Sequence, residues 1–356
     1  MVDRYKWSKQ ELYRERDYLL KNREYGFYTS EIYDEMIALI DNKKAATDVK
    51  DFTSLLKREL ALFEKCRLDD MALATILVIA NEIDKLPIFE APYLAPFDFT
   101  ARDIIDITHE FFESLDSEYY QNAMRIINRK HAIHYDNENI TINARGSCYY
   151  NEFLKRCYIF VRRDNTLSDV FVTNHEVMHN NEYLSSKTGN TSPYAPLFEE
   201  IGSLYTHFAT IDFLIKKGIK SEYVKAVAQE EYNLINSCCI QLLASYSTME
   251  FIRQNKQDID VITQRDINRN LVDLGLLVTD PRSCIDGNMT SAIRYAISYI
   301  AANTLYQNYD KQKQISILKE MNLAIINPGI ILESHGISLE AEPNIKALKL
   351  HAKSIL

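Results

Sequence analysis

Apolar residues recur at a helical period along most of the chain. In ARDIIDITHEFFESLD (101–116) they stand three or four positions apart, which places them on one broad side of a helix. Thr100, followed three residues later by Asp103, resembles a capping box with aspartate in the glutamate position, and it marks the start of this helix. The same period runs through residues 8–90 and predicts several helices there. The pattern therefore predicts a mainly α-helical fold.

Two short segments break the helical pattern. NITINARG (139–146) and RCYIFVRR (156–163) are rich in β-branched and aromatic residues, and turn-forming residues follow each of them. They predict strands of one small β-sheet. The helical pattern then returns near Thr166 or Ser168.

The segment PIFEAPYLAPFDF (87–99) is the best candidate for a connector. It holds three prolines and has no helical period. A chain of 356 residues is long enough for two lobes. We therefore expect a helical N-terminal lobe at residues 1–95 and a larger domain at residues 96–356.

Composition and charge narrow the class of protein. A hydrophobic fraction of 46% and a charged fraction of 26% are ordinary for a globular protein with a sizeable core. The net charge of −9 argues against a nucleic-acid partner, because binding to phosphates relies on an excess of lysine and arginine. The apolar run MALATILVIA (71–80) is shorter than the roughly 20 residues that span a bilayer. The start lacks a secretory signal pattern, and the six cysteines form no CxxC pair, so we expect no membrane association, free thiols and a cytoplasmic location.

The stretch TNHEVMHNNEYL (173–184) carries the candidate chemistry. His175 and His179 are four residues apart, so on a helix their rings share one face and can reach one tetrahedral metal ion. Glu176 projects about 100° away from His175, which lets it act as a base toward a metal-bound water without being a ligand. The alternative is that two histidines share a helix face by chance. The motif favours a zinc hydrolase.

A zinc site of this kind needs a third protein ligand and an open fourth position. The candidates downstream are Glu182, Glu199, Glu200 and His207. The pair of glutamates lies in PLFEEIGSLYTHFATIDFL, which predicts a second helix. A second helix that brings a glutamate onto two histidines of the first is a thermolysin-like layout. Periodicity alone does not choose between Glu199 and Glu200.

Several stretches together resemble the thimet oligopeptidase and oligoendopeptidase F family of zinc peptidases. RGSCYY, RCYIFVRRDNTLSDVFVTNHEVMH, SCCIQLLASYSTMEF and IRYAISYIAAN are similar to its core, and the similarity spans about residues 95 to 350. The family's Glu-Ile-x-Ser segment, whose glutamate binds zinc, is matched by Glu200-Ile201-Gly202-Ser203. The resemblance thus implies a two-lobed helical peptidase fold and one Zn²⁺ per chain, held by His175, His179 and Glu200. The region before residue 95 is much shorter than in full-length relatives.

The resemblance also implies roles in catalysis and substrate binding. Glu176 would be the general base, and Tyr299, with Tyr295 one helical turn earlier, would donate a hydrogen bond to the oxyanion. Asn288 aligns with a family histidine that holds the substrate. The substrate would be an oligopeptide that pairs along the edge of the strand CYIFV (157–161). The residues of that strand expected to contact it are Tyr158, Ile159 and Phe160.

The sequence departs from the family at three positions. Met178 replaces the glycine of the HExGH motif, Asn288 replaces the histidine, and His207 stands where relatives often carry a carboxylate. These departures favour a second interpretation, a weak or inactive relative that binds peptides. The sequence gives no indication of an oligomeric state. Because Glu176 and the three ligands are all present, we expect a zinc metallopeptidase that hydrolyses oligopeptides.

Overall fold

The computed structural model describes most of the chain between residues 99 and 337 and a few residues outside that range. The described residues are 99–129, 132–136, 145–151, 156–185, 198–274, 288–323 and 328–337, together with 56–57, 60–61, 77–78 and 346. Nearly all of the expected N-terminal lobe (1–95) and the connector at 87–99 fall outside these ranges, so the expected division of the chain at residue 95 stays a prediction.

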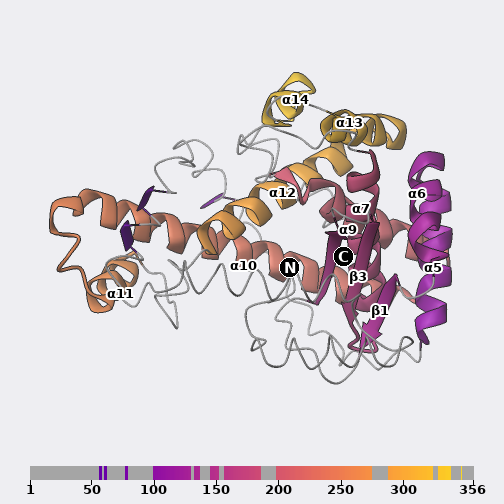
Figure 1. Ribbon diagram of the computed structural model, residues 1–356, viewed down its shortest axis with the longest axis horizontal. Helices are drawn as coiled ribbons and strands as arrows, with labels where there is room; N and C mark the ends of the chain where they lie inside the picture. The colour runs from indigo at the N-terminus through magenta and orange to yellow at the C-terminus, as the bar shows by residue number, and fades with distance from the viewer. Residues whose placement is uncertain are drawn as a thin grey trace. The chain divides into compact units, whose positions relative to one another are not determined.

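Helices make up most of the described chain, as the apolar pattern predicted (Figure 1). The helix predicted at residues 101–116 is present, with both hydrogen bonds of its capping box at Thr100 and Asp103. The described helices, including one short 3₁₀ helix, η1, are α5 (Ala101–Leu115), α6 (Ser117–Ile127), α7 (Ser168–Ser185), α9 (Ile201–Lys216), α10 (Ser221–Gln254), η1 (Lys256–Asp258), α11 (Gln264–Asp273), α12 (Asn288–Asn308), α13 (Lys311–Leu323) and α14 (Pro328–Ser334).

One three-stranded sheet is described, with the order β1-β3-β2. Strand β1 (Ile133–Asp136) runs parallel to β3 (Arg156–Arg162), and β2 (Gly146–Asn151) runs antiparallel to it. The strand predicted from RCYIFVRR is confirmed. Of the predicted strand NITINARG only the last two residues are described, and Gly146, expected to end a strand, begins β2 instead.

The expectation that CYIFV forms a sheet edge is wrong. Strand β3 is the central strand, because Ile159 is paired with Ile133 on one side and with Cys148 on the other. A strand paired on both sides has no free row of backbone groups to offer a peptide. The edges of the described sheet are β1 and β2. The reason for the error is that an apolar, β-branched run indicates a strand but not its neighbours.

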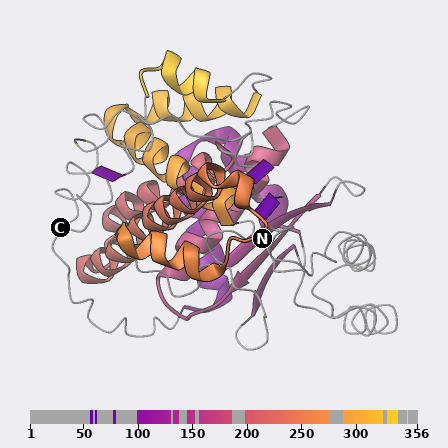
Figure 2. The same ribbon diagram turned by 90° about the vertical axis from the view of Figure 1, so that its left-hand side faces the viewer.

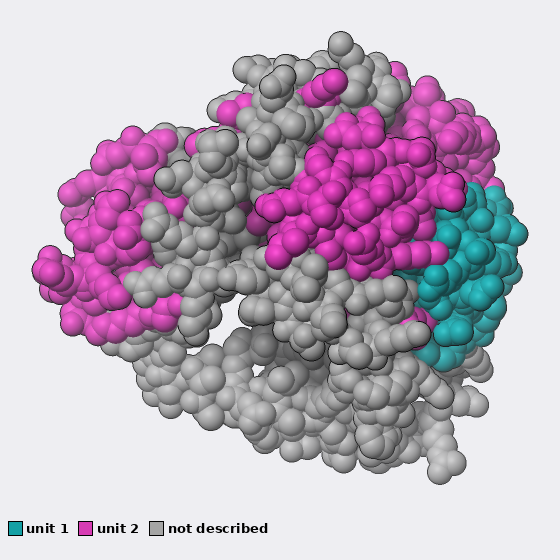
Figure 3. All heavy atoms as spheres, turned by 90° about the horizontal axis from the view of Figure 1, so that it is seen from above, with its two compact units in different colours: residues 1–50, 96–181 teal, residues 51–95, 182–356 magenta. Residues whose placement is uncertain are grey.

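The chain divides into two compact units, which are coloured separately in Figure 3. The first comprises residues 1–50 and 96–181, and its described part holds α5, α6, the sheet and most of α7. Helices α5 and α6 pack against each other, and each buries an apolar stripe. This unit therefore supplies the part of α7 that carries His175, Glu176 and His179.

The second unit comprises residues 51–95 and 182–356. Within it α12 packs against both α9 and α10, as Figures 1 and 2 show. Tyr205, Tyr232 and Tyr299 are among the largest side chains buried in this helical core. Among the described helices, none is long and apolar enough to span a membrane.

Candidate metal centre and active site

The motif helix α7 begins at Ser168, as the sequence predicted, and a buried carboxylate fixes its start. Asp169 is 1% exposed, and its two oxygens accept the backbone N–H groups of Asp164 at 2.9 Å and Asn165 at 3.1 Å. Burial raises the pKa of Asp169, and the hydrogen bond from the Asp164 backbone acts in the opposite direction. A carboxylate in the first turn also suits the positive end of the helix dipole. The turn that leads from β3 into α7 is thereby tied to the helix.

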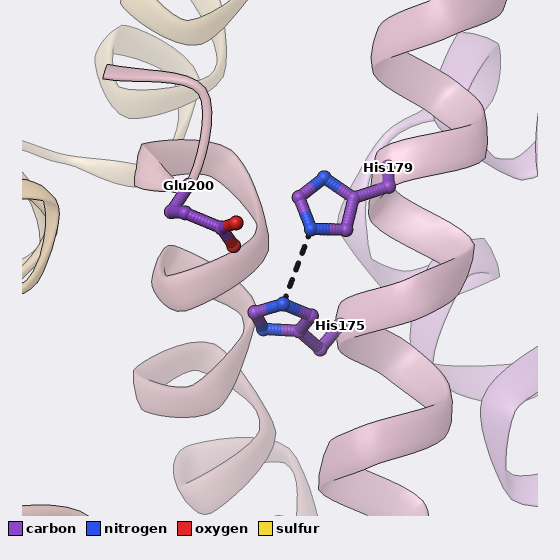
Figure 4. A group of neighbouring side chains, drawn as sticks. All are labelled: His175, His179 and Glu200. Carbon is purple, nitrogen blue, oxygen red and sulfur yellow. Dashed lines mark hydrogen bonds between the residues drawn. The ribbon is translucent and has the colours of Figure 1, made fainter. Parts of the chain in front are cut away.

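The two motif histidines lie together on α7, as Figure 4 shows. Their Nε2 atoms are 3.2 Å apart, and the rings meet edge to face. Nitrogen ligands at 2.0–2.1 Å from a tetrahedral ion would be about 3.3 Å apart. The spacing of His175 and His179 therefore suits a shared metal ion.

Glu200 completes a group of three. The ligand atoms of His175, His179 and Glu200 all lie within 4.8 Å of one another, and the Glu200 carboxylate points toward the two rings (Figure 4). In the described part of the chain this is the one group of at least three such side chains placed to hold a metal ion. Two nitrogens and one oxygen are the donor set of catalytic zinc sites that keep an open position. The residues present therefore fit a zinc ion.

The structure separates the two glutamates that periodicity could not distinguish. Glu200 is 5% exposed and is the N-cap residue of α9, so it stands just before the helix on which the sequence placed it. The side chain of Glu199 is 47% exposed and forms an ion pair with Arg294. Ser203, one turn into α9, donates a hydrogen bond to Glu200 Oε2 at 3.2 Å. Glu200 is thus the carboxylate that joins the histidines.

Glu176 is buried beside His175, with 5% of its surface exposed. Strand β2 passes so close to it that a Cβ added to Gly146 would lie 2.6 Å from Glu176 Oε1 and 2.6 Å from Val172 Cγ1. Only a residue without a side chain fits there. The sequence indicated Gly146 only as a turn residue. A glycine at the end of a predicted strand (139–146) was the available sign of close backbone approach.

Tyr299 lies in the core of the second unit with 1% of its surface exposed. Its hydroxyl donates to Glu231 Oε2 at 3.2 Å, and Nδ1 of His207 is 2.5 Å from the same oxygen. Burial, assisted by the charge of Glu231, raises the pKa of Tyr299 well above its ordinary value. His207 therefore has a carboxylate partner on α10. The sequence did not single out Glu231, because nothing in its local pattern shows that α10 packs here.

Tyr295, one turn earlier on α12, is half-buried, and the guanidinium carbon of Arg294 lies 5.2 Å from its ring centroid. The expected contacts in β3 are less accessible. Ile159 and Phe160 are buried at 1% and 5% exposure, and Tyr158 lies beneath the guanidinium of Arg129 at 5.0 Å. Two of these three side chains therefore contribute to packing.

Comparison with known proteins gives a fold but no sequence match. No family model matches the chain, and no curated protein matches it. A Bacillus anthracis structure assigned as an oligoendopeptidase F aligns with a TM-score of 0.55 and 12% identity, over 98% of this chain and 67% of that one. PZ peptidase A, solved with an inhibitor, aligns with a TM-score of 0.60 and 12% identity, over 91% and 68%. A structure from Chlamydophila abortus assigned as a peptidase aligns with a TM-score of 0.52 and 13% identity, over 98% of this chain and 62% of that one.

The chain has the oligoendopeptidase F fold. At 12–13% identity the likeness establishes the fold alone, and it confirms the structural side of the resemblance that the sequence motifs suggested. Within this oligoendopeptidase F fold, Met178 is fully buried in α7 at the position of the motif glycine. Asn288 is the first residue of α12, and its side chain lies outside the described part of the structure.

Proposed function

We propose that this chain is a zinc-dependent peptidase that hydrolyses peptide bonds of oligopeptides. The observation that carries the proposal is the convergence of His175, His179 and Glu200, with Glu176 next to the first of them. The peptidases of the same fold support it.

One zinc ion per chain would be held by the two imidazoles and the carboxylate, with the fourth position left open. When bound there, zinc polarises the scissile carbonyl and lowers the pKa of a water molecule to about 7. The neighbouring residues fix the ligands. Ser203 donates to Glu200, and α7 holds both histidines at the required spacing.

Glu176 is the general base of the proposed reaction. Its carboxylate accepts a proton from the attacking water as the water oxygen bonds to the carbonyl carbon. It then passes this proton to the amine nitrogen as the C–N bond breaks. Its position beside Gly146 holds it against strand β2, an edge of the described sheet. The base is therefore placed where an extended peptide could run.

The two tyrosines of α12 are the candidates for the oxyanion donor. The family resemblance favours Tyr299, but its hydroxyl is bonded to Glu231 in the helical core. Tyr295 is half-buried, and the Arg294 guanidinium lies against its ring. These surroundings support Tyr295 as the donor and Tyr299 as a residue that supports α12.

The substitution Glu176→Gln tests the proposal. The variant should keep one zinc per chain and its peptide affinity, but lose turnover by several orders of magnitude, because an amide cannot accept the proton. Metal analysis measures the zinc content, a peptide-binding titration measures the affinity, and digestion of a peptide library with and without chelator measures turnover. Glu182→Gln, on the same helix, is the control and should keep activity. A wild-type protein without zinc would exclude the proposed metal centre.

A second candidate function is peptide binding without cleavage. It is favoured by the engagement of Tyr299 with Glu231 and by the replacement of the family histidine with Asn288. A zinc-loaded wild-type protein that binds peptides from the library but cleaves none of them would establish it.

A further inference from the structure

Arg294 is a buried cation close to the candidate metal centre. It lies on α12 with its side chain 14% exposed, and Nη1 donates to Glu199 Oε1. Its Nε lies 3.6 Å from Glu200 Oε1. This Nε is buried and has no hydrogen-bond partner. A buried donor without a partner is costly, so a small adjustment of Glu200 that completes this contact would be favourable.

The two oxygens of Glu200 face different partners. The Ser203 hydroxyl lies 3.2 Å from Oε2 and is shared with the Glu200 backbone carbonyl at 2.9 Å, whereas Oε1 faces the guanidinium of Arg294. A carboxylate that ligates a metal uses one lone pair for the metal and is oriented by donors to its remaining lone pairs. Ser203 belongs to α9, which begins directly after Glu200, whereas Arg294 comes from the neighbouring α12. The carboxylate is therefore oriented by two independent elements.

Glu199, next to Glu200 in the chain, contacts Arg294 and is not one of the candidate metal ligands. Glu199 is half-exposed and outside the group of metal-ligating atoms, yet it holds the guanidinium through a charge-assisted hydrogen bond. A planar guanidinium can address two carboxylates at once, which a lysine ammonium does with less geometric definition. Of the two consecutive glutamates, Glu200 lies with the candidate metal ligands and Glu199 holds the guanidinium.

We propose that Arg294 is a positioning residue that orients the Glu200 carboxylate for metal binding, with Glu199 as its anchor. The inference rests on the proposed function, in which Glu200 is a ligand. Loss of Arg294 also removes a positive charge that repels a divalent cation. Loss of orientation therefore predicts weaker metal binding, and loss of the charge predicts tighter metal binding. The ion pair with Glu199 already balances the charge of Arg294, so the loss of orientation is the larger effect.

The test measures the zinc affinity of the whole chain by competition with a chromophoric chelator. Arg294→Met should weaken zinc binding by roughly 10- to 100-fold, the usual effect of removing a group that orients a ligand. Arg294→Lys should recover only part of this. Cobalt substitution provides a second measurement, because the visible absorption of Co²⁺ reports its coordination, and Arg294→Met should change that spectrum. Unchanged or tighter zinc binding by Arg294→Met would overturn the proposal.

Glu199→Gln keeps the proposal testable if Arg294→Met does not fold. This half-exposed substitution should preserve the fold, as measured by circular dichroism, and weaken zinc binding less than Arg294→Met. In the double variant the two effects should not add, because both act on the same contact. Full additivity, or an unchanged affinity of Glu199→Gln, would contradict the role of the anchor. A wild-type chain that binds no zinc refutes the proposed function, whereas zinc binding insensitive to Arg294 refutes only this inference.

Discussion

At the residue scale, Gly146 sets the distance between strand β2 and the base. A methyl group added there would meet Glu176 Oε1 and Val172 Cγ1, each at 2.6 Å from its carbon. We expect Gly146→Ala to displace the glutamate and lower kcat at least 10-fold, with zinc content unchanged and a loss of about 1–3 kcal/mol in stability from overpacking. Kinetics, metal analysis and a thermal melt measure the three properties.

The neighbouring residue in the same strand provides the control for Gly146→Ala. The hydroxyl of Ser147 is buried without a hydrogen-bond partner, so Ser147→Ala adds no volume and removes no bond. It should leave kcat near the wild-type value. A Gly146→Ala variant with wild-type kcat would show that Glu176 tolerates the displacement.

Tyr295 and Tyr299 differ in their surroundings, and this difference predicts different effects of removing each hydroxyl. Tyr295→Phe should lower kcat by roughly 10²–10³ with little change in KM, as expected for the loss of an oxyanion donor. Tyr299→Phe should instead cost about 1 kcal/mol of stability, because its hydroxyl is bonded to Glu231. Its kcat should stay within a few-fold of wild type. Steady-state kinetics beside thermal melts separate the two roles, and the reverse outcome would assign the donor role to Tyr299.

At the scale of the element, the start of α7 depends on Asp169. Its carboxylate accepts two backbone N–H groups from the turn after β3. Asp169→Ala should lower the free energy of unfolding by about 1.5–3 kcal/mol, the range for hydrogen bonds to a charged group. Denaturant unfolding measures the change. Asp106→Ala is the control, because Asp106 is half-exposed on α5 and its ion pair with Arg102 is solvated. This variant should lose no more than about 0.5 kcal/mol in the free energy of unfolding.

At the scale of the whole molecule, metal binding should stabilise the fold. The ligands come from α7 and from the start of α9, so zinc binds the folded chain and not the unfolded one. Free zinc at 100 times Kd should add about 2.7 kcal/mol of stability. The chelated protein should therefore melt at a lower temperature, and added zinc should restore it. His179→Ala should melt at the same temperature with and without zinc, and a zinc-dependent shift in that variant would place the metal elsewhere.

The sequence alone determined the features that depend on local chemistry. The apolar period fixed the mainly helical fold, the cap at Thr100 fixed the start of α5, and the four-residue spacing of His175 and His179 fixed their common face. The family resemblance then selected Glu200, which the structure places with both histidines. These features were predictable because neighbours along one helix are set by its repeat.

Tertiary structure decided the features that depend on which elements are neighbours. The pairing of β3 on both sides, the approach of Gly146 to Glu176 and the bond from Tyr299 to Glu231 each join residues of different elements. A strand pattern does not identify the neighbouring strands, and the sequence around Glu231 gives no sign of the tyrosine that its carboxylate will bind. The sequence by itself determined which residues carry the chemistry of this protein. Only packing between helices and strands decided which of them are held, buried or left accessible.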